Sequence, residues 1–404
     1  MTTQRFLFLQ GVRSPFFSQL GLALRAAGHS VSKINFAAGD HVYWRIGASL
    51  PYRGSMADLP AFYDQQYAAH DITDVVLFGD CRPVHRPAVE RAQATGIRVH
   101  VFEEGYFRPY WVTLERDGVN GNSRLPRDPA WYREQARTVP RYDNGQPFAS
   151  PFWLRAAHDV GYNFWAGLNP LLYPRVRSHV PYSPAAEYLG YLGRACRLHL
   201  RARCDAAAIM RLLEASQHHP YYLVPLQLAT DAQIVDHSPF PDMAAALHEI
   251  MASFARHAPA GTRLAVKLHP LDPGMVNYAR RVKRWARDYD IADRVVYLES
   301  GPLPELISAA QGVVTVNSTV GASAILHSRP TMALGDAIYR MPGLTCQASL
   351  DDFWQEHQPP DTRLFHDFRN VVIHRTQING GFYCSRGISA AVERSLQRMT
   401  ASPV

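Results

Sequence analysis

The chain has 404 residues, of which 47% are hydrophobic and 19% are charged, a balance typical of a folded globular protein. A chain of this length is expected to form two or three domains with substantial cores. Its formal net charge of +7 favours anionic partners, such as sugar nucleotides, phospholipid head groups or nucleic acid. The sequence contains no zinc-finger spacing, ribonucleoprotein signature or lysine-rich arm, so we expect no nucleic-acid partner.

The start of the chain and its cysteines indicate a reducing compartment. A strand is predicted directly after the first residues, which leaves no room for the cationic region and cleavage site of a signal peptide. No stretch approaches the roughly 20 continuous apolar residues that a membrane span requires. The five cysteines are scattered without a close pair, so neither a disulfide framework nor a zinc site is predicted. We therefore expect a cytoplasmic protein.

The first part of the chain alternates between strands and helices. Strands are predicted over 5–10, 30–36, 74–80 and 98–104, with a helix around 20–27. The loop 11–16 lies at the carboxyl end of the first strand. The dinucleotide fingerprint GxGxxG is absent, which argues against an NAD enzyme. We predict a Rossmann-like domain over 1–150.

The stretch 151–215 has a different composition, in which aromatic residues and arginines are interleaved. Such a mixture suits the head-group region of a lipid bilayer, where amphipathic rings and cations are both stabilised. The alternative is a helical segment between domains, whose aromatic side chains lie in a core and whose arginines are solvated. Both interpretations remain open at this point.

The alternation of strands and helices resumes near residue 221. Strands are predicted over 221–227, 264–268, 294–298, 313–316 and 331–335, and helices over 243–257, 278–289, 350–353 and 388–399, with a turn at 379–383. We predict a second Rossmann-like domain over 216–350, followed by helices over 351–404 that brace the two domains. Two such domains facing a cleft form the α/β architecture called GT-B, which many nucleotide-sugar glycosyltransferases use.

Two apolar strands of this second domain end in polar or small residues. These residues are His269, Pro270, Asn317, Ser318, Thr319 and Gly321. Ligands of open parallel sheets bind at the carboxyl ends of the strands, and the start of the next helix offers N–H groups to an anion. The sequence therefore predicts a phosphate site here, although each motif alone is also typical of an ordinary turn or helix cap.

Several short segments stand out by their joint pattern: 78–85, 101–109, 120–123, 225–231, 267–270 and 317–321. Together they resemble the bacterial capsule polysaccharide biosynthesis family, in particular its KpsS and LipB type, over most of the chain. The resemblance implies transfer of Kdo (3-deoxy-D-manno-oct-2-ulosonic acid) from CMP-Kdo to a phosphatidylglycerol or lysophosphatidylglycerol acceptor, which starts the capsule linker. It also implies a position on the inner face of the inner membrane, with a companion Kdo transferase and the capsule export machinery as partners.

The resemblance places the CMP-sugar donor in the second domain. Because the departing phosphate gains negative charge, hydrogen-bond donors are needed around it, and His269 is expected to donate to it. Lys267 either contacts the donor or points away, since neighbouring strand residues alternate faces. The predicted donor-binding residues are Gln227, Lys267, Pro270, Asn317, Ser318, Thr319 and Gly321.

Two acidic positions are predicted to be catalytic together with His269. The β linkage implied by the resemblance retains the donor configuration, so a double displacement needs a carboxylate nucleophile, for which we choose Asp231. Gln227 is expected to hold either this carboxylate or that of the donor. Glu103 and Glu104 end a strand on opposite faces, and we favour Glu104 as the base for the acceptor hydroxyl. The alternative for these acids is capping of a turn or helix.

Four basic residues are weaker candidates for contacts to an acceptor phosphate or a Kdo carboxylate, because guanidinium groups suit both anions. They are Arg13, Arg82, His85 and Arg108, and Glu103 joins them as a weaker sugar contact. No divalent metal or other cofactor is predicted, because histidine and helix dipoles are expected to stabilise the phosphate. Two other functions stay open, namely transfer from another CMP-sugar such as CMP-sialic acid, and a non-catalytic role in capsule assembly or export.

Overall fold

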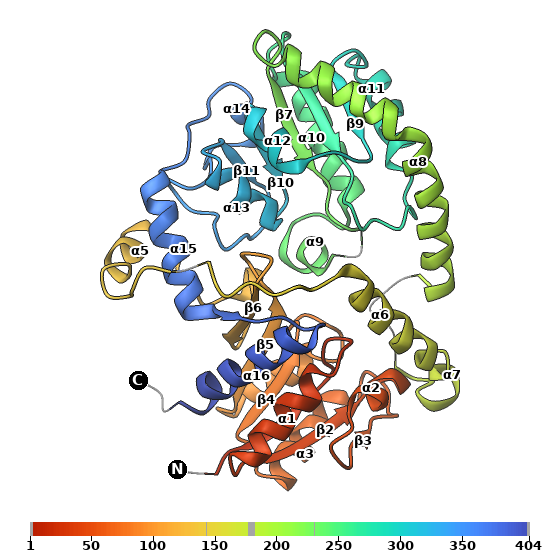
Figure 1. Cartoon of the computed structure of the whole chain (residues 1–404), viewed down its shortest axis with the longest axis vertical. Helices are drawn as coiled ribbons and strands as arrows, with labels where there is room; N and C mark the ends of the chain where they lie inside the picture. The colour runs from red at the N-terminus through yellow and green to blue at the C-terminus, as the bar shows by residue number, and fades with distance from the viewer. Residues whose placement is uncertain (1–2, 143, 177–181, 230, 402–404) are drawn as a thin grey trace. The chain divides into compact units, whose positions relative to one another are not determined.

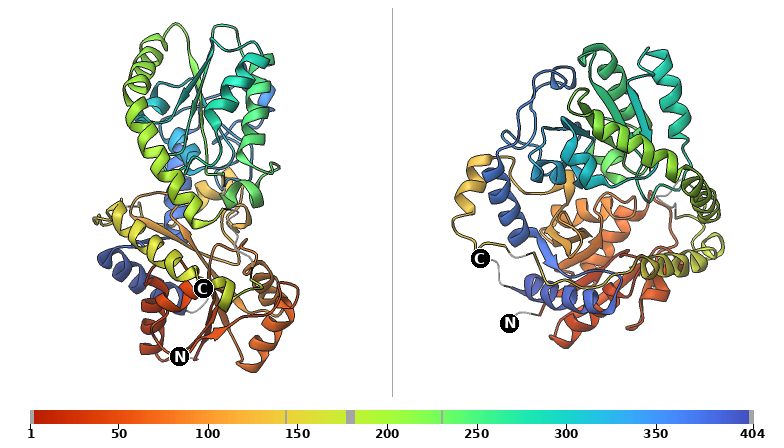
Figure 2. Two further views of the ribbon diagram at one scale, coloured as in Figure 1. Left: turned by 90° about the vertical axis from the view of Figure 1, so that its right-hand side faces the viewer. Right: turned by 45° about the horizontal axis from the view of Figure 1, so that its top comes forward.

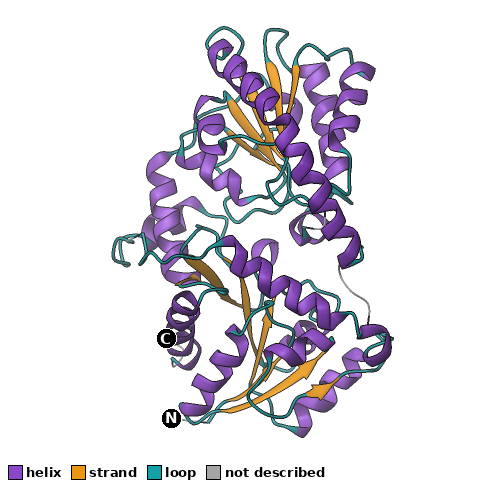
Figure 3. Cartoon of the chain, turned by 45° about the vertical axis from the view of Figure 1, so that its right-hand side comes forward, coloured by secondary structure: helices purple, strands orange, loops and turns teal. Residues whose placement is uncertain are grey.

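The computed structural model describes residues 3–142, 144–176, 182–229 and 231–401 (Figure 1). The chain forms two compact units that are each built from separated stretches. Unit 1 comprises Met1–Arg124, Val139–His179 and Asn370–Val404, and unit 2 comprises Leu125–Thr138 and Val180–Arg369. Each unit holds a largely or wholly parallel sheet with helices on both faces (Figure 3), which confirms the predicted α/β class with two Rossmann-like sheets.

The sheet of unit 1 has the strand order β12-β6-β5-β4-β1-β2-β3. Its strands are β1 (Arg5–Phe8), β2 (Ser30–Asn35), β3 (Leu50–Pro51), β4 (Asp74–Phe78), β5 (Arg98–Glu104), β6 (Trp111–Arg116) and β12 (Gln377–Asn379). The strands from β3 to β5 pair in parallel, whereas β6 pairs antiparallel with both β5 and β12. This antiparallel edge was not predicted from the sequence. Asn379, expected to begin a turn, instead ends β12.

Helices cover both faces of this sheet. They are α1 (Phe16–Ala26), α2 (Ala38–Tyr43), α3 (Leu59–Ala69), α4 (Arg86–Ala94), α6 (Phe152–Ala166), α7 (Asn169–Leu172) and α16 (Ser385–Thr400), with the short 3₁₀ helix η1 (Asn120–Asn122). Side chains alternate along β1, so Phe6 and Phe8 pack with α1 and α16 while Leu7 packs with α3 and α4. Two further views show these layers (Figure 2).

Unit 2 has a fully parallel sheet with the order β11-β10-β7-β8-β9. Its strands are β7 (Tyr221–Pro225), β8 (Arg263–Lys267), β9 (Val295–Leu298), β10 (Gly312–Thr315) and β11 (Thr331–Ala333). Its helices are α5 (Pro129–Gln135), α8 (Pro184–Ala215), α9 (Ala232–His237), α10 (Met243–His257), α11 (Tyr278–Asp288), α12 (Leu303–Ala309), α13 (Thr319–Leu326) and α14 (Leu350–Phe353), while α15 (Thr362–Thr376) runs on into unit 1. Tyr222 and Tyr221 of β7 enter separate cores on the two faces, as expected for a buried parallel strand.

The aromatic and arginine-rich stretch 151–215 is divided between the units. Its helices α6 and α7 belong to unit 1 and α8 belongs to unit 2. Some of its aromatic rings lie in a core, such as Tyr162 and Tyr173, whereas Trp153 and Phe164 are exposed. Arg194 of α8 is buried, which contradicts the expectation that the arginines are solvated. Among the helices of the described residues, none has the length and apolar character needed to cross a bilayer.

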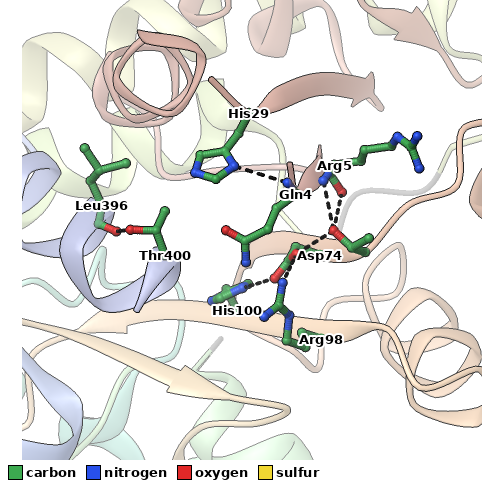
Figure 4. Close-up of polar contacts among 9 residues, drawn as sticks. Gln4, Arg5, His29, Asp74, Arg98, His100, Leu396 and Thr400 are labelled. Carbon is green, nitrogen blue, oxygen red and sulfur yellow. Dashed lines mark hydrogen bonds and ion pairs between the residues drawn. The ribbon is translucent and has the colours of Figure 1, made fainter. Parts of the chain in front are cut away.

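A buried ionic cluster stabilises the amino ends of the unit 1 strands, at the edge away from the strand-end loops discussed below (Figure 4). The Asp74 carboxylate lies 2.7 Å from His100 Nε2 and 2.6 Å from Arg98 Nη2, and Thr73 donates a third hydrogen bond at 2.7 Å. Burial alone would raise the pKa of Asp74, but these partners hold it below its ordinary value. Because the cluster is closed and its members satisfy one another, we assign it to stability.

Candidate functional site

In unit 2 the direction of the strand order reverses between β7 and β10. The chain runs outward from β7 through β8 to β9 and then returns to place β10 on the other side of β7. The loops after β7 and β10 therefore leave in opposite directions, and such a reversal is the place where open α/β sheets bind their ligands. Both loops contain residues that the sequence analysis singled out.

A pair of buried amide side chains joins these two loops. Gln227 Nε2 donates to Asn317 Oδ1 at 3.1 Å, and Gln227 Oε1 accepts from the Asn317 backbone N–H at 3.1 Å. Asn317 Nδ2 also donates to the carbonyl oxygens of Gln233 and His237, which ties α9 to the end of β10. Gln227 is 3% exposed and Asn317 is 6% exposed. The two amides therefore form a structural brace between the loops after β7 and β10.

Asp231 lies at the outer end of this brace. Its Oδ1 accepts from the Gln233 backbone N–H at 3.0 Å and so caps α9, while Gln227 Nε2 approaches its Oδ2 at 3.4 Å. Of the two roles expected for Gln227, the structure supports the one that positions Asp231. The capping role expected as the ordinary alternative for Asp231 is present, and its catalytic role stays a prediction.

The start of α13 lies at the same strand-order reversal, directly after β10. Ser318 caps the helix by accepting from the Val320 N–H at 3.2 Å, and the Tyr339 hydroxyl donates to the Ser318 carbonyl. A Cβ at Gly321 would lie only 2.1 Å from the Tyr339 hydroxyl, so glycine is required for this contact. Ser318 and Thr319 remain partly exposed, as the predicted phosphate contacts require.

His269 follows β8, the strand beside β7. Its Nδ1 accepts from the Leu271 backbone N–H at 3.0 Å, so in the neutral ring the proton lies on Nε2. The ring is half-buried and Pro270 is exposed. A proton on Nε2 is compatible with the donor role predicted for His269, which stays a prediction.

Two buried cations lie beneath this turn. Arg194 of α8 donates to the carbonyl of Pro270 at 2.8 Å and to that of Asp272, so it holds the 269–272 turn in place. Lys267 is buried and donates to the Leu268 carbonyl at 3.3 Å. Burial lowers the pKa of Lys267, Arg194 adds to this shift, and Asp205 of α8 opposes it. Lys267 therefore faces α8, which matches the alternative that it points away and differs from its place among the predicted donor-binding residues.

Unit 1 has a corresponding reversal of strand order between β1 and β4. Arg82, after β4, donates to Gln10 Oε1 at 3.2 Å and to the Gly11 carbonyl at 3.4 Å, both after β1. Burial lowers the pKa of Arg82, and the charge of Glu103 opposes this shift. In unit 1 a guanidinium group therefore joins the loops at the reversal, whereas in unit 2 a pair of amides joins them.

The two glutamates that end β5 have separate partners. Glu103 accepts from the Glu104 backbone N–H at 2.9 Å and interacts electrostatically with Arg82. Glu104 lies 3.3 Å from Arg155 of α6 and accepts from the Tyr383 hydroxyl at 3.2 Å. The Arg155 guanidinium also lies over the Tyr383 ring, 5.1 Å from its centre. Tyr383 lies in a segment for which the sequence suggested only a turn.

A deeper polar cluster lies beside Arg82. Lys33 is buried and donates to the Leu9 carbonyl at 2.7 Å, and Asp40 accepts from the Tyr162 hydroxyl at 2.9 Å. Burial lowers the pKa of Lys33 to about 8, Asp40 opposes the shift and Arg82 adds to it. A cavity of about 20 Å³ lies between these side chains. Sequence analysis missed Lys33, Asp40 and Tyr162, which come from three separate elements.

The other predicted basic residues lie in different surroundings. Arg13 pairs with Asp159 of α6, and its guanidinium lies over the Tyr162 ring, 5.0 Å from the centre. His85 is buried at the start of α4 with its Nδ1 2.6 Å from the Gly79 carbonyl, as a structural histidine would be. Arg108 is exposed on the loop between β5 and β6. The structure therefore brings Arg13, Arg82 and Glu103 together but not Arg108.

Residues 73–383 match the family model described as capsule polysaccharide biosynthesis protein. The chain belongs to this family. It is 35% identical to the capsule polysaccharide export protein KpsS of Escherichia coli over 384 residues, which cover 95% of this chain and 98% of KpsS. It is 36% identical to the capsule polysaccharide modification protein LipB of Neisseria meningitidis serogroup B over 387 residues, which cover 95% of this chain and 92% of LipB. The predicted family and its KpsS and LipB type are thereby confirmed.

Solved structures with a related arrangement include KpsC of Thermosulfurimonas dismutans. A chain described as its beta Kdo 2,7 transferase aligns with a TM-score of 0.48 and 14% identity over 98% of both chains. A second, described as its beta Kdo 2,4 transferase, aligns with a TM-score of 0.40 and 12% identity, over 91% of this chain and 90% of that one.

Proposed function

We propose that this protein of the capsule polysaccharide biosynthesis family is a glycosyltransferase that moves Kdo from CMP-Kdo to a phosphatidylglycerol or lysophosphatidylglycerol acceptor. Relatives named for capsule polysaccharide export and modification support a role in the capsule pathway. One structural observation carries the chemical proposal. At the β7–β10 reversal, the buried Gln227–Asn317 pair holds Asp231, and His269 leaves the neighbouring strand as a donor.

In this proposal the donor phosphate binds between His269 and the start of α13. His269 Nε2–H donates to the phosphate oxygens, with Ser318 and Thr319 as further contacts at the helix start. These groups stabilise the negative charge that develops as CMP departs. None of these steps calls for a metal ion or another cofactor.

Two steps then retain the configuration of the sugar. Asp231 attacks the anomeric carbon of Kdo as the bond to the CMP phosphate breaks, which forms a glycosyl ester and releases CMP. The acceptor hydroxyl next attacks the same carbon, the bond to Asp231 breaks, and a carboxylate base accepts the hydroxyl proton, which is the role that the sequence predicts for Glu104. Gln227 acts as a positioning residue for Asp231 in both steps.

The direct test combines purified protein, CMP-Kdo and a short-chain phosphatidylglycerol. Mass spectrometry should detect the lipid with one added Kdo and, in trapped protein, a Kdo adduct on the peptide that contains Asp231. The absence of both, in a preparation whose circular dichroism shows the folded α/β protein, would contradict the proposal.

Two other functions are distinguished by the same assay. A transferase for another CMP-sugar would release CMP from CMP-sialic acid and leave CMP-Kdo intact. A non-catalytic partner in capsule export, which the name of the KpsS relative suggests, would turn over neither donor. A lipid acceptor would place the protein at the inner face of the inner membrane, beside a companion Kdo transferase and the export machinery.

A further inference from the structure

Helix α6 turns a polar face toward the interior of unit 1. This face consists of Arg155, Asp159 and Tyr162, whose i, i+4, i+7 spacing places them on one side of the helix. Their partners are Glu104 for Arg155, Arg13 for Asp159, and both Asp40 and Gln10 for Tyr162. Every one of these partners lies at or just beyond the end of β1, β2 or β5, at the candidate site of unit 1.

The same face packs tightly against α2, beside which α6 and α7 lie (Figure 1). Gly39 of α2 leaves room for the Tyr162 ring, because a Cβ at position 39 would lie only 2.7 Å from carbon atoms of that ring. The backbone N–H of Ala38 donates to Asn169 Oδ1 of α7 at 2.8 Å. Helices α6 and α7 are therefore held rigidly to unit 1 by their polar side.

The opposite face of α6 is apolar and open to solvent. Trp153, Val160 and Phe164 follow i, i+7, i+11 spacing, and 64%, 51% and 75% of their respective surfaces are exposed. At 100° per residue they lie on the side opposite Arg155 and Tyr162. Leu168 and Leu171 continue the exposed surface into α7, where Leu171 is 82% exposed. An ordinary surface helix has the reverse arrangement, with its apolar side buried.

We propose that this apolar face of α6 and α7 docks into the interfacial region of an anionic phospholipid bilayer. Large aromatic and aliphatic side chains on one side of a helix enter the boundary between head groups and acyl chains. The charges fit an anionic surface, because Arg155 and Asp159 face inward and are paired with Glu104 and Arg13, whereas Arg175, just after α7, is exposed. The other face of the same helix contacts the candidate site of unit 1, so docking would place this site near the bilayer surface, with α6 between the two.

This inference rests on the proposed function for the identity of the lipid. The docking surface itself is inferred from the exposed apolar residues of α6 and α7. Vesicles of phosphatidylcholine and phosphatidylglycerol in equal amounts serve as the probe, and co-sedimentation measures binding. Trp153→Ser combined with Phe164→Ser should weaken binding by roughly tenfold or more, since two large side chains leave the interface. The matched control combines Leu22→Ser on α1 with Leu50→Ser on β3, which are also exposed residues of unit 1, and it should bind as the unchanged protein does.

A second measurement separates this inference from the proposed function. Transfer to a short-chain, non-aggregated phosphatidylglycerol should be the same in the α6 double variant and in the unchanged protein, whereas transfer to lipid in vesicles should fall with binding. Equal vesicle binding by both proteins would overturn the docking surface even if transfer is observed. Loss of self-association in the double variant, without loss of vesicle binding, would also overturn it and assign the face to contacts between copies.

Discussion

The two strand-order reversals of this protein are built from different chemistry on the same kind of sheet. In unit 2 the reversal is bridged by the neutral amides of Gln227 and Asn317, which leave Asp231 as the acid at its rim. In unit 1 the equivalent place is ionic, with Arg82 joined to Gln10 and close to Glu103. A neutral brace suits the positioning of one reactive carboxylate, and an ionic cluster suits the recognition of an anion.

The two units also share a feature, which is a buried lysine near the strand-order reversal. Each places a buried lysine on the strand next to its first strand, Lys33 on β2 and Lys267 on β8, and each lysine donates to the carbonyl of the following residue. Burial lowers the pKa of both. Each lysine also has an acid and an arginine nearby: Asp40 and Arg82 for Lys33, and Asp205 and Arg194 for Lys267. The same strand position thus has the same kinds of charged neighbours in both units.

The largest effect is expected at the unit 2 reversal. Asp231→Asn should lower Kdo transfer by about a thousandfold or more, because the amide keeps the α9 cap but removes the nucleophile. Asp242→Asn is the control, since Asp242 caps α10 by accepting from the Ala245 N–H at 2.7 Å. Similar activity in the two variants would reduce Asp231 to a helix cap and would remove the chemical contrast between the units.

The Asp74 cluster, at the amino ends of the unit 1 strands, allows a comparison that concerns stability alone. Asp74→Asn should lower the free energy of unfolding by about 3–5 kcal/mol, because Arg98 loses a buried ionic partner. Asp64→Asn removes an exposed pair with Arg91 and should cost less than about 1 kcal/mol. Urea unfolding followed by circular dichroism measures both values, and equal costs would show that burial of the Asp74 cluster contributes little.

His269→Ala tests the phosphate contact next to the β7–β10 reversal. The loss of one donor to the departing phosphate should cost about 2–4 kcal/mol of transition-state stabilisation, seen as a fall in kcat/KM for CMP-Kdo. His327, at the other end of α13, supplies the control His327→Ala. An unchanged kcat/KM in the first variant would remove His269 from the site.

The smallest effect concerns the paired lysines. The folded state lowers the pKa of Lys33 from 10.5 to about 8, so the unfolded chain binds more protons between these values. Stability should therefore rise with pH across this window, by on the order of 1 kcal/mol per pH unit, as the buried charge is relieved. Lys33→Met should reduce this slope, and Lys267, whose pKa burial also lowers, would contribute to what remains. Because the chain has three lysines, ε-¹³C labelling allows NMR to follow Lys33 directly, and a pKa near 10.5 would contradict the prediction.

Sequence periodicity predicted the parallel strands and several helices, including α10 and α14 with the bounds that the structure has. It also predicted which polar residues lie at the strand ends of unit 2, because apolar strands that stop at polar residues mark strand ends regardless of their neighbours. It missed the β6 and β12 edge, since pairing between Ile378 and Val112 joins segments that are far apart in the chain. The buried arginine Arg194 was missed for the same reason, because its partners are carbonyls of a distant turn.

By itself, the sequence determined the α/β class, the strand ends and the polar residues placed there, because these depend on local patterns of hydrophobicity. The tertiary structure decided which of these residues meet: that Gln227 braces Asn317, that Tyr383 reaches Glu104, and that Tyr162 closes on Asp40. It also decided that the polar side of α6 is buried against unit 1 and that its apolar side is exposed to solvent. Helical periodicity identifies two faces, but which face is buried depends on what the rest of the fold presents to them.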